Sequence, residues 1–325
     1  MTTTLTDAPA PAARTGKRGL LHGLTWLVVR QHRAALYCVL ALTVLGAAAV
    51  LQLRHEMIEL LDAAGWPGRQ PVDQVNASRV YDWLTLLLGS LPVILAVFLG
   101  APLIAGDQEQ GTAQLVTTQS VPRRRWLIAK LGLALAVALV SGTVLSALFT
   151  WWWKPYRTVF GGAWLDGAIF DSTGPVLPAL CLFLTAAGIT VGVLTRRVLA
   201  AMTGTFVFSV VALGAWDYVR PMLAPHRTFT YPLDGPLPDR FAQAQEMDRW
   251  IASADGTLYG WGLCAKPTEA AAEACVKEHG IVNSVMEYLD YDQMPAMQWT
   301  GAGVLLAGTV LLTVFVVWRA SRRPL

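Results

Sequence analysis

The segment GDQEQGTAQLVTTQSVPRRRWLIAK, residues 106–130, is a dense polar island between two long apolar runs. The run before it, residues 84–106, contains no charged residue, and the run after it, residues 127–150, contains only Lys130. Each run exceeds 20 residues, so as a helix it is long enough to cross a hydrocarbon core of about 30 Å. The island is therefore predicted to connect two membrane spans.

Apolar blocks of the same kind recur along the whole chain. It has 325 residues, of which 54% are hydrophobic and only 14% are charged, whereas a soluble chain carries about 25% charged residues. In hydrocarbon each block must satisfy its own backbone groups, which a helix does. The sequence thus predicts an all-α polytopic membrane protein rather than a soluble two-domain protein. Six transmembrane helices are expected, at 34–53, 84–106, 127–150, 176–195, 198–216 and 299–318.

Basic residues indicate how these helices are oriented. If the N-terminus is cytoplasmic, that side of the membrane holds 14 basic and 3 acidic residues, and the other side holds 11 basic and 19 acidic residues. Cytoplasmic loops carry an excess of Lys and Arg. The sequence therefore predicts an N-in/C-in topology in the cell membrane.

The segments before the first span and after the last one are polar. Residues 1–17 are predicted to be a disordered cytoplasmic tail, and 319–325 a second tail. Residues 18–33 place leucines at helical spacing and arginines elsewhere, which is typical of an interfacial helix, although a longer first span is the alternative. The Ala47–Ala49 run resembles a signal-peptidase site, but the apolar run continues beyond it, so we expect a retained span.

Residues 217–298 form the longest polar segment and are predicted to be an extracellular domain between helices 5 and 6. Cys264 and Cys275 lie in it, and on the oxidising side of a membrane a disulfide is favoured over two free thiols. The connections 54–83 and 154–175 are expected on the same face. Gly188 and Gly192 in the fourth span have the spacing that lets helices approach closely.

Catalytic and metal-binding motifs are absent from the sequence. His55-Glu56 lacks the second histidine of a zinc motif, and the sequence TGKR at 15–18 lacks the glycine and hydroxyl residue of a phosphate loop. We expect no catalytic residue, no metal, no nucleic-acid partner and no cofactor bound by this chain. The spans are also expected to bury almost no ionisable group, which argues against an ion-coupled carrier.

The polar island carries the candidate functional residues. Acidic side chains are stabilised at the positive end of a helix dipole, its N-terminus. A short helix over 107–126 can therefore begin at Asp107 and Glu109. A glycine-threonine bend and an arginine cluster follow, facing lipid phosphates or an acidic partner. The candidates are Asp107, Glu109, Gly111, Thr112, Arg123, Arg124 and Arg125.

These residues resemble those of a known family, the permease subunits of type-2 ATP-binding-cassette (ABC) transporters, mostly exporters, and in particular its actinobacterial branch. In that family the second span ends in an acid-rich stretch, followed by Gly-Thr, a Thr-Gln stretch, an Arg and a Lys that opens the third span. The sequence LTWLVVRQHR at 24–33 is similar to the family's N-terminal connecting helix, and MQWTGAG at 297–303 to its closing helix.

The resemblance implies a division of labour between chains. A second permease copy, identical or a paralogue, would pair with this one, and each would dock a separate ATPase subunit that binds ATP and Mg²⁺. Residues 107–126 would be the coupling helix seated on that ATPase, with lipids around the spans. The cargo would move out of the cell, and the scarcity of polar groups in the spans favours a hydrophobic or amphipathic one.

Two other functions remain open at this point. One is a sensor or receptor that displays 217–298 as a ligand-binding ectodomain without any ATPase. The other is a polytopic membrane enzyme with its site in the loops, which the lack of motifs disfavours.

Overall fold

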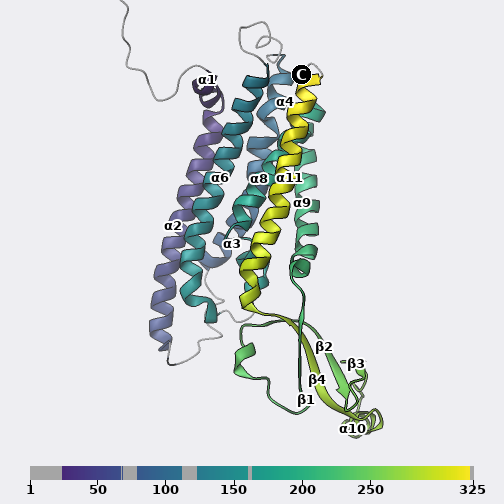
Figure 1. The fold of residues 1–325 in the computed structure, drawn as a ribbon. Helices are drawn as coiled ribbons and strands as arrows, with labels where there is room; N and C mark the ends of the chain where they lie inside the picture. Colours follow the sequence, from purple (N-terminus) through teal and green to yellow (C-terminus); the bar gives the residue numbers. More distant parts are fainter. Residues whose placement is uncertain (1–23, 67, 69–78, 112–122, 160–162, 323–325) are drawn as a thin grey trace, which may run out of the picture.

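The computed structural model describes residues 24–66, 68, 79–111, 123–159 and 163–322, and most of them are helical. Six helical segments in this part of the chain are long and apolar enough to cross a membrane, and they form one elongated bundle (Figure 1). Their bounds are Arg33–Ala64, Arg79–Glu109, Arg124–Val159, Val176–Thr195, Val198–Leu223 and Tyr291–Ala320. The six predicted spans are confirmed.

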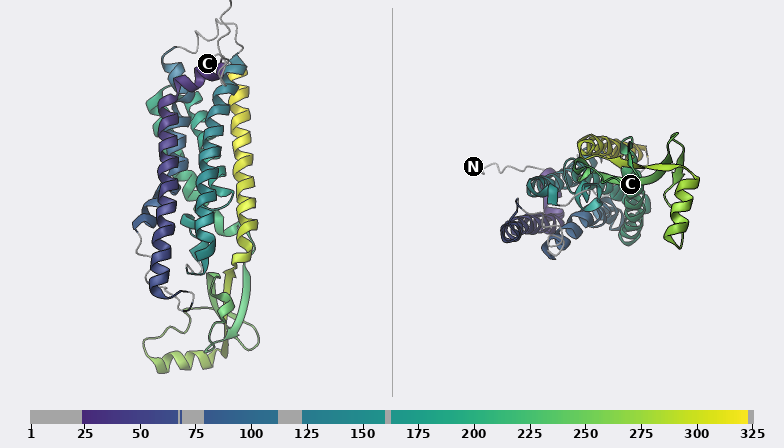
Figure 2. Two further views of the ribbon diagram at one scale, coloured as in Figure 1. Left: turned by 90° about the vertical axis from the view of Figure 1, so that its left-hand side faces the viewer. Right: turned by 90° about the horizontal axis from the view of Figure 1, so that it is seen from below.

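The bundle has two different ends. Helix α1 (Leu24–Gln31) and the C-terminus of α11 (Met294–Arg322) lie at one end, which we call the α1 end. A small β-sheet lies at the opposite end, which we call the sheet end (Figures 1 and 2). Between them α8 (Val176–Thr195) is the central helix. In its apolar stretch 78% is buried inside the bundle, against 17% in that of α2 (Arg33–Ala64).

The second span is interrupted. It consists of α3 (Arg79–Ile94), a π-helical segment η2 (Leu95–Gly100) and α4 (Pro102–Glu109). Pro102 has no backbone N–H, so the regular ladder fails just before it, and the Ala101 N–H donates to the Ala96 carbonyl five residues earlier, at 2.8 Å. A wider turn of this kind is a bend between two stiffer helices.

Helix α8 packs against this interruption at backbone distance. A Cβ on Gly188 would lie 2.4 Å from the Ala96 carbonyl oxygen, and one on Gly192 would lie 2.4 Å from that of Ala101. The close approach predicted from the spacing of these two glycines is therefore confirmed. Any larger residue at either position would push α8 away from η2.

Helix α2 is longer than its apolar block. It continues through polar residues 54–64, which were predicted to belong to a connecting loop, and ends at Gly65, whose φ is 75°. The Gly65 N–H closes the helix on the Asp62 carbonyl at 3.2 Å. The prediction was wrong here because hydropathy marks what a membrane can bury, while a helix continues until a residue such as glycine ends it.

The remaining long helices follow the predicted order. Helix α6 (Arg123–Tyr156) is the third span, α9 (Val198–Val219) the fifth and α11 the sixth. Helix α8 has the predicted bounds of the fourth block, and α1 is a helix separate from α2, with a break at His32. Short helical turns connect α6 to α8, namely η3 (Arg157–Val159), η4 (Ala163–Leu165) and α7 (Gly167–Phe170).

The segment between α9 and α11 corrects the expectation of an all-helical chain. After the turn η5 (Arg220–Leu223) it forms a four-stranded antiparallel sheet in the order β1-β4-β2-β3. The strands, with an intervening turn η6 (Asp239–Phe241), are β1 (Arg227–Pro232), β2 (Gln245–Ser253), β3 (Leu258–Gly260) and β4 (Ile281–Leu289). Aromatic and β-branched residues along β1 and β4 favour this paired, half-buried surface over helix.

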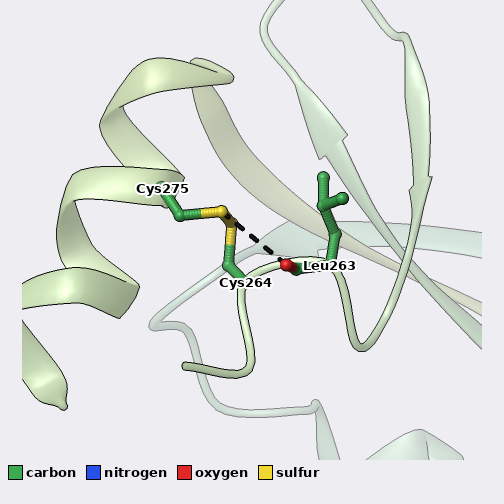
Figure 3. The surroundings of a disulfide bond; sticks show 3 residues. All are labelled: Leu263, Cys264 and Cys275. Atoms are coloured by element: carbon green, nitrogen blue, oxygen red, sulfur yellow. Dashed lines mark hydrogen bonds between the residues drawn. A yellow bond between two sulfur atoms is a disulfide. The ribbon is translucent and has the colours of Figure 1, made fainter. Parts of the chain in front are cut away.

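A disulfide closes the small core of the sheet end. Cys264 and Cys275 are bonded, so the predicted pairing is confirmed, and the bond ties α10 (Glu269–Glu278) to the chain after β3 (Figure 3). The Cys275 sulfur lies 3.8 Å from the Leu263 carbonyl oxygen, a contact rather than a true hydrogen bond because a disulfide sulfur carries no proton. Ile251 and Ile281 pack with the two cysteines.

The sheet is attached to the bundle by polar contacts. Arg227 at the start of β1 holds Asp292 through two nitrogens, at 3.0 and 3.1 Å. The Trp164 indole donates to the Gln243 carbonyl at 2.8 Å. Asp292 lies in η7 (Tyr291–Gln293), the turn that leads into α11, so the sheet and the last span are joined directly.

Candidate functional site

The last turn of α4 buries a charge pair at the α1 end of the bundle. Lys130, in the second turn of α6, is completely buried, and its ammonium group donates a hydrogen bond to the Asp107 carboxylate, which is only 7% exposed. The same ammonium donates to the Leu103 carbonyl at 3.1 Å. A buried lysine is stable only with such partners, so this pair fixes α4 against α6.

Helix α1 joins the same pair. The Gln31 amide donates to the other oxygen of Asp107 at 2.7 Å, and the Trp126 ring centroid lies 4.9 Å from the Lys130 nitrogen. Asp107 therefore contacts α1 and α6 at once, while the aromatic ring covers the ammonium group. We call these four residues, Gln31, Asp107, Trp126 and Lys130, the α4 clamp.

His32 lies beside the α4 clamp at the break between α1 and α2. Burial lowers the pKa of His32, and the positive charge of Lys130 lowers it further, to about 4, with Asp107 opposing. The imidazole is therefore neutral at physiological pH. A second positive charge beside Lys130 would leave the one carboxylate of Asp107 to balance two cations.

Glu109 ties α4 to a third helix. Its carboxylate accepts a hydrogen bond from the backbone N–H of Val198, the first residue of α9, at 2.7 Å. The first N–H groups of a helix have no partner inside the helix and carry its positive dipole end, so a carboxylate is favoured there. Arg197, which precedes α9, makes no side-chain cap of its own. A residue of α4 thus caps α9.

The other predicted site residues are spread around this turn. Gly111 follows α4 with a φ of 68°, a conformation that favours glycine. Arg124 and Arg125 are exposed on the first turn of α6, and Arg123 begins that helix. Thr112 lies outside the described residues. The two flanks of the predicted coupling helix 107–126 belong to α4 and α6, and the part between them, 112–122, lies outside the described residues, so that helix stays a prediction.

Three residues of the α4 clamp, Gln31, Trp126 and Lys130, were missed as site residues. Lys130 was noted as the only charge in its apolar block, and that isolation was the available signal, because a lone lysine in a span requires a buried acceptor. Gln31 gave no signal, since its contact depends on how α1 folds back. The expectation that the spans bury almost no ionisable group is wrong for Asp107 and Lys130 and for Arg220, which is 6% exposed at the sheet end.

The described residues contain no group of three or more His, Cys, Asp or Glu side chains arranged to hold a metal ion. The polar groups of the α4 clamp contact one another. Together with Glu109, this arrangement can transmit a displacement of α4 to α1, α6 and α9.

Comparison with known proteins identifies the family of the chain. The family model described as ABC-2 membrane transporter related matches residues 39–220, which is more than half of the chain. The match includes Asp107, Lys130 and Glu109 and stops before the sheet. No curated protein and no solved structure gives a significant match. The chain is a member of the ABC-2 membrane transporter related family.

Proposed function

We propose that the chain is the permease subunit of an ABC exporter and that the α4 clamp, together with Glu109, transmits the motion of a separate ATPase subunit to the spans. The observation that carries the proposal is the position of α4. Its last turn holds α6 through Lys130, α1 through Gln31 and α9 through Glu109, directly before residues 112–122. Permeases of the ABC-2 family work with an ATPase subunit, and this connection is where such a subunit would act.

The proposed topology places the α1 end in the cytoplasm and the sheet end outside the cell. Arg124 and Arg125 are exposed at the α1 end, as expected for a cytoplasmic face. The Cys264–Cys275 bond lies at the sheet end, and disulfides persist in oxidising compartments. In this orientation α1 is the interfacial helix and the sheet is the extracellular domain.

The proposed mechanism depends on which segments of the bundle move as rigid bodies and which segment bends. Closure of the ATPase dimer would press on the connection after α4. Because α4 is bonded to α1, α6 and α9, the parts of these helices that lie at the α1 end of the bundle would move with it. The π-helical segment η2 would absorb the bend, since its wider turn is followed by a proline that cannot complete the ladder. ATP binding would thereby shift the bundle between inward-open and outward-open states.

Two such chains, identical or paralogous, would enclose the transport path, as the resemblance to type-2 ABC permeases implies. The cargo class we propose is hydrophobic or amphipathic, because the outward faces of the spans are apolar and the α4 clamp keeps its charges paired. The actinobacterial branch of the family stays a prediction.

The test is a charge reversal at Glu109. In Glu109→Lys an ammonium group replaces the carboxylate that caps α9, and the positive end of the α9 dipole repels it. We expect the chain to insert and to bind its ATPase, while transport per ATP hydrolysed falls about tenfold or more. The measurement is transport and ATP hydrolysis by the complex reconstituted in vesicles.

The matched control is Glu109→Gln, which retains an oxygen that can accept from the Val198 N–H. We expect this variant to keep most of the coupling. Full coupling in Glu109→Lys, in a complex that retains its ATPase, would refute the proposal. Failure of any cassette ATPase to co-purify with an active chain would favour the sensor function instead.

A further inference from the structure

A cavity of about 510 Å³ lies at the sheet end, far along the bundle from the α4 clamp. Its walls come from α3, α7, α8, α9 and the turn η5. Asp82 and Asp217 line it and are themselves exposed, which marks them as its mouth. The volume is within the range of small-molecule sites, about 300–1,000 Å³.

One side of the cavity is charged. The Arg220 guanidinium donates to the Asp171 carboxylate at 2.8 Å and lies 2.9 Å from that of Asp217. The Trp216 indole donates to the second oxygen of Asp171 at 2.8 Å. Asp171 is therefore fully engaged, and a single guanidinium is shared between two carboxylates.

Asp82 adds a third carboxylate to the lining. Among the described residues no cation or hydrogen-bond donor engages its side chain, and no other basic residue lines the cavity. With all four groups ionised, the lining carries three negative charges and one positive charge. The excess is negative and lies at the mouth, where a positive group on a ligand would meet Asp82 and Asp217.

The rest of the wall is apolar and open. Leu86 and Leu213, from α3 and α9, present accessible apolar surface to it, while Leu88, Leu177 and Leu180 also line it but are almost fully buried. Gly89 lines it as well, and a Cβ built there would meet no atom within 4 Å. The absence of a side chain at this position keeps the α3 wall of the cavity free. A hydrophobic body can therefore lie against leucines while its charged group lies at the mouth.

We propose that this cavity binds an amphipathic cation, with its hydrophobic body against the leucine wall and its positive group between Asp82 and Asp217. The site deepens the proposed transport function and rests on it for its role as a cargo site. Binding itself requires no ATPase. In the proposed topology the mouth lies near the extracellular headgroups, where such a molecule would leave the protein.

The experiment compares two ions of equal shape and opposite charge, tetraphenylphosphonium and tetraphenylborate. Each is titrated onto the full chain in phosphatidylcholine nanodiscs without an ATPase. We expect the cation to bind about tenfold or more tightly than the anion, the effect of one close charge in a partly screened site. Equal affinity for the two ions would overturn the proposal.

Variants assign the binding to the cavity. Asp82→Asn/Asp217→Asn should weaken cation binding about tenfold, while Asp234→Asn, an exposed aspartate that does not line the cavity, should leave it unchanged. Gly89→Leu should abolish binding of both ions, because its side chain enters the cavity. Unchanged cation binding in the double variant or in Gly89→Leu would overturn the proposal. Since no ATPase is present, these results are independent of the Glu109→Lys test.

The positive group can belong to a free cation or to a lipid headgroup. Replacing part of the nanodisc lipid with phosphatidylethanolamine separates the two sources. If phosphatidylethanolamine competes with tetraphenylphosphonium, and the double variant abolishes this competition, the positive group belongs to a lipid. Absence of competition, with wild-type binding intact, assigns the site to a free amphipathic cation.

Discussion

The two ends of the bundle each bury a basic residue against an aspartate, but they differ in what surrounds the pair. At the α1 end Lys130 is completely buried, and both of its hydrogen-bond acceptors, Asp107 and the Leu103 carbonyl, belong to α4. At the sheet end Arg220 is shared between Asp171 and Asp217 and lines a cavity of about 510 Å³. One pair is enclosed by protein, and the other faces a space that a ligand can enter.

The difference shows how similar chemistry can serve two purposes. A closed pair with few partners fixes two helices in one geometry, and losing either partner leaves an uncompensated charge. A shared pair beside a cavity tolerates the loss of one carboxylate and leaves negative charge for a ligand. This difference supports the two proposals, transmission of force by the α4 clamp and recognition by the sheet-end cavity.

The largest expected effect is on the closed pair. Lys130→Met leaves Asp107 buried without its cation and should lower the free energy of unfolding by about 3–5 kcal/mol. Lys130→Met/Asp107→Leu should restore most of it, since an apolar pair of similar volume is often neutral. Thermal unfolding of the detergent-solubilised chain measures both. Equal loss in the single and double variants would contradict the claim that the loss in Lys130→Met comes from the unpaired charge of Asp107.

The second-largest effect on stability is expected at the contact between α8 and η2, which lies between the two ends of the bundle. Gly188→Ala places a Cβ 2.4 Å from the Ala96 carbonyl oxygen, and forcing α8 away from η2 should cost about 1–3 kcal/mol. Gly132→Ala, in α6, is the matched control, since its Cβ would meet no atom within 4 Å. The comparison of the two thermal midpoints tests the close packing. A Gly188→Ala chain as stable as Gly132→Ala would contradict it.

The shared pair should be more tolerant. In Asp171→Asn, Arg220 keeps Asp217 at 2.9 Å and the Leu165 carbonyl at 3.2 Å, and the asparagine oxygen can still accept from Trp216. We expect a loss of about 1–2 kcal/mol, smaller than that in Asp107→Asn. Chemical unfolding of the two variants side by side measures the difference. A larger loss in Asp171→Asn would reverse the comparison.

The smallest effect concerns pH at the α1 end. The folded pKa of His32 is about 4, below its ordinary value of 6.5, so the unfolded chain binds its proton first. Stability should therefore fall as pH is lowered from 6.5 toward 4. At pH 5 we expect a loss of about 1 kcal/mol, allowing for partial solvent screening. His32→Gln should remove this part of the pH dependence, and an unchanged profile in that variant would refute it.

Hydropathy accounts for the features of the fold that the sequence predicts correctly. The six spans follow from apolar blocks of about 20 residues, and α8 has the predicted bounds because Pro175 and the Arg196-Arg197 pair enclose it. The extension of α2 was missed because polar residues also form helices, although Gly65 signalled its end. The sheet was missed because β1 and β4 pair across more than 50 residues, which no local pattern specifies.

The site residues show the same distinction between features set by local sequence and features set by packing. Asp107 and Glu109 were selected from the sequence, but their partners Lys130, Gln31 and the Val198 N–H depend on helix packing. The Cys264–Cys275 pair was predictable because it is local. The sheet-end cavity brings together Asp82, Asp171 and Arg220, which are far apart in the chain, so spacing alone could not reveal it.

One titration tests the central claim, that the closed end transmits and the open end recognises. ATP hydrolysis by the complex is measured against increasing tetraphenylphosphonium. We predict that Asp82→Asn/Asp217→Asn raises the half-maximal concentration about tenfold with the same maximum. Lys130→Met/Asp107→Leu should lower the maximal stimulation at an unchanged half-maximal concentration. Full stimulation in this second variant would contradict the account.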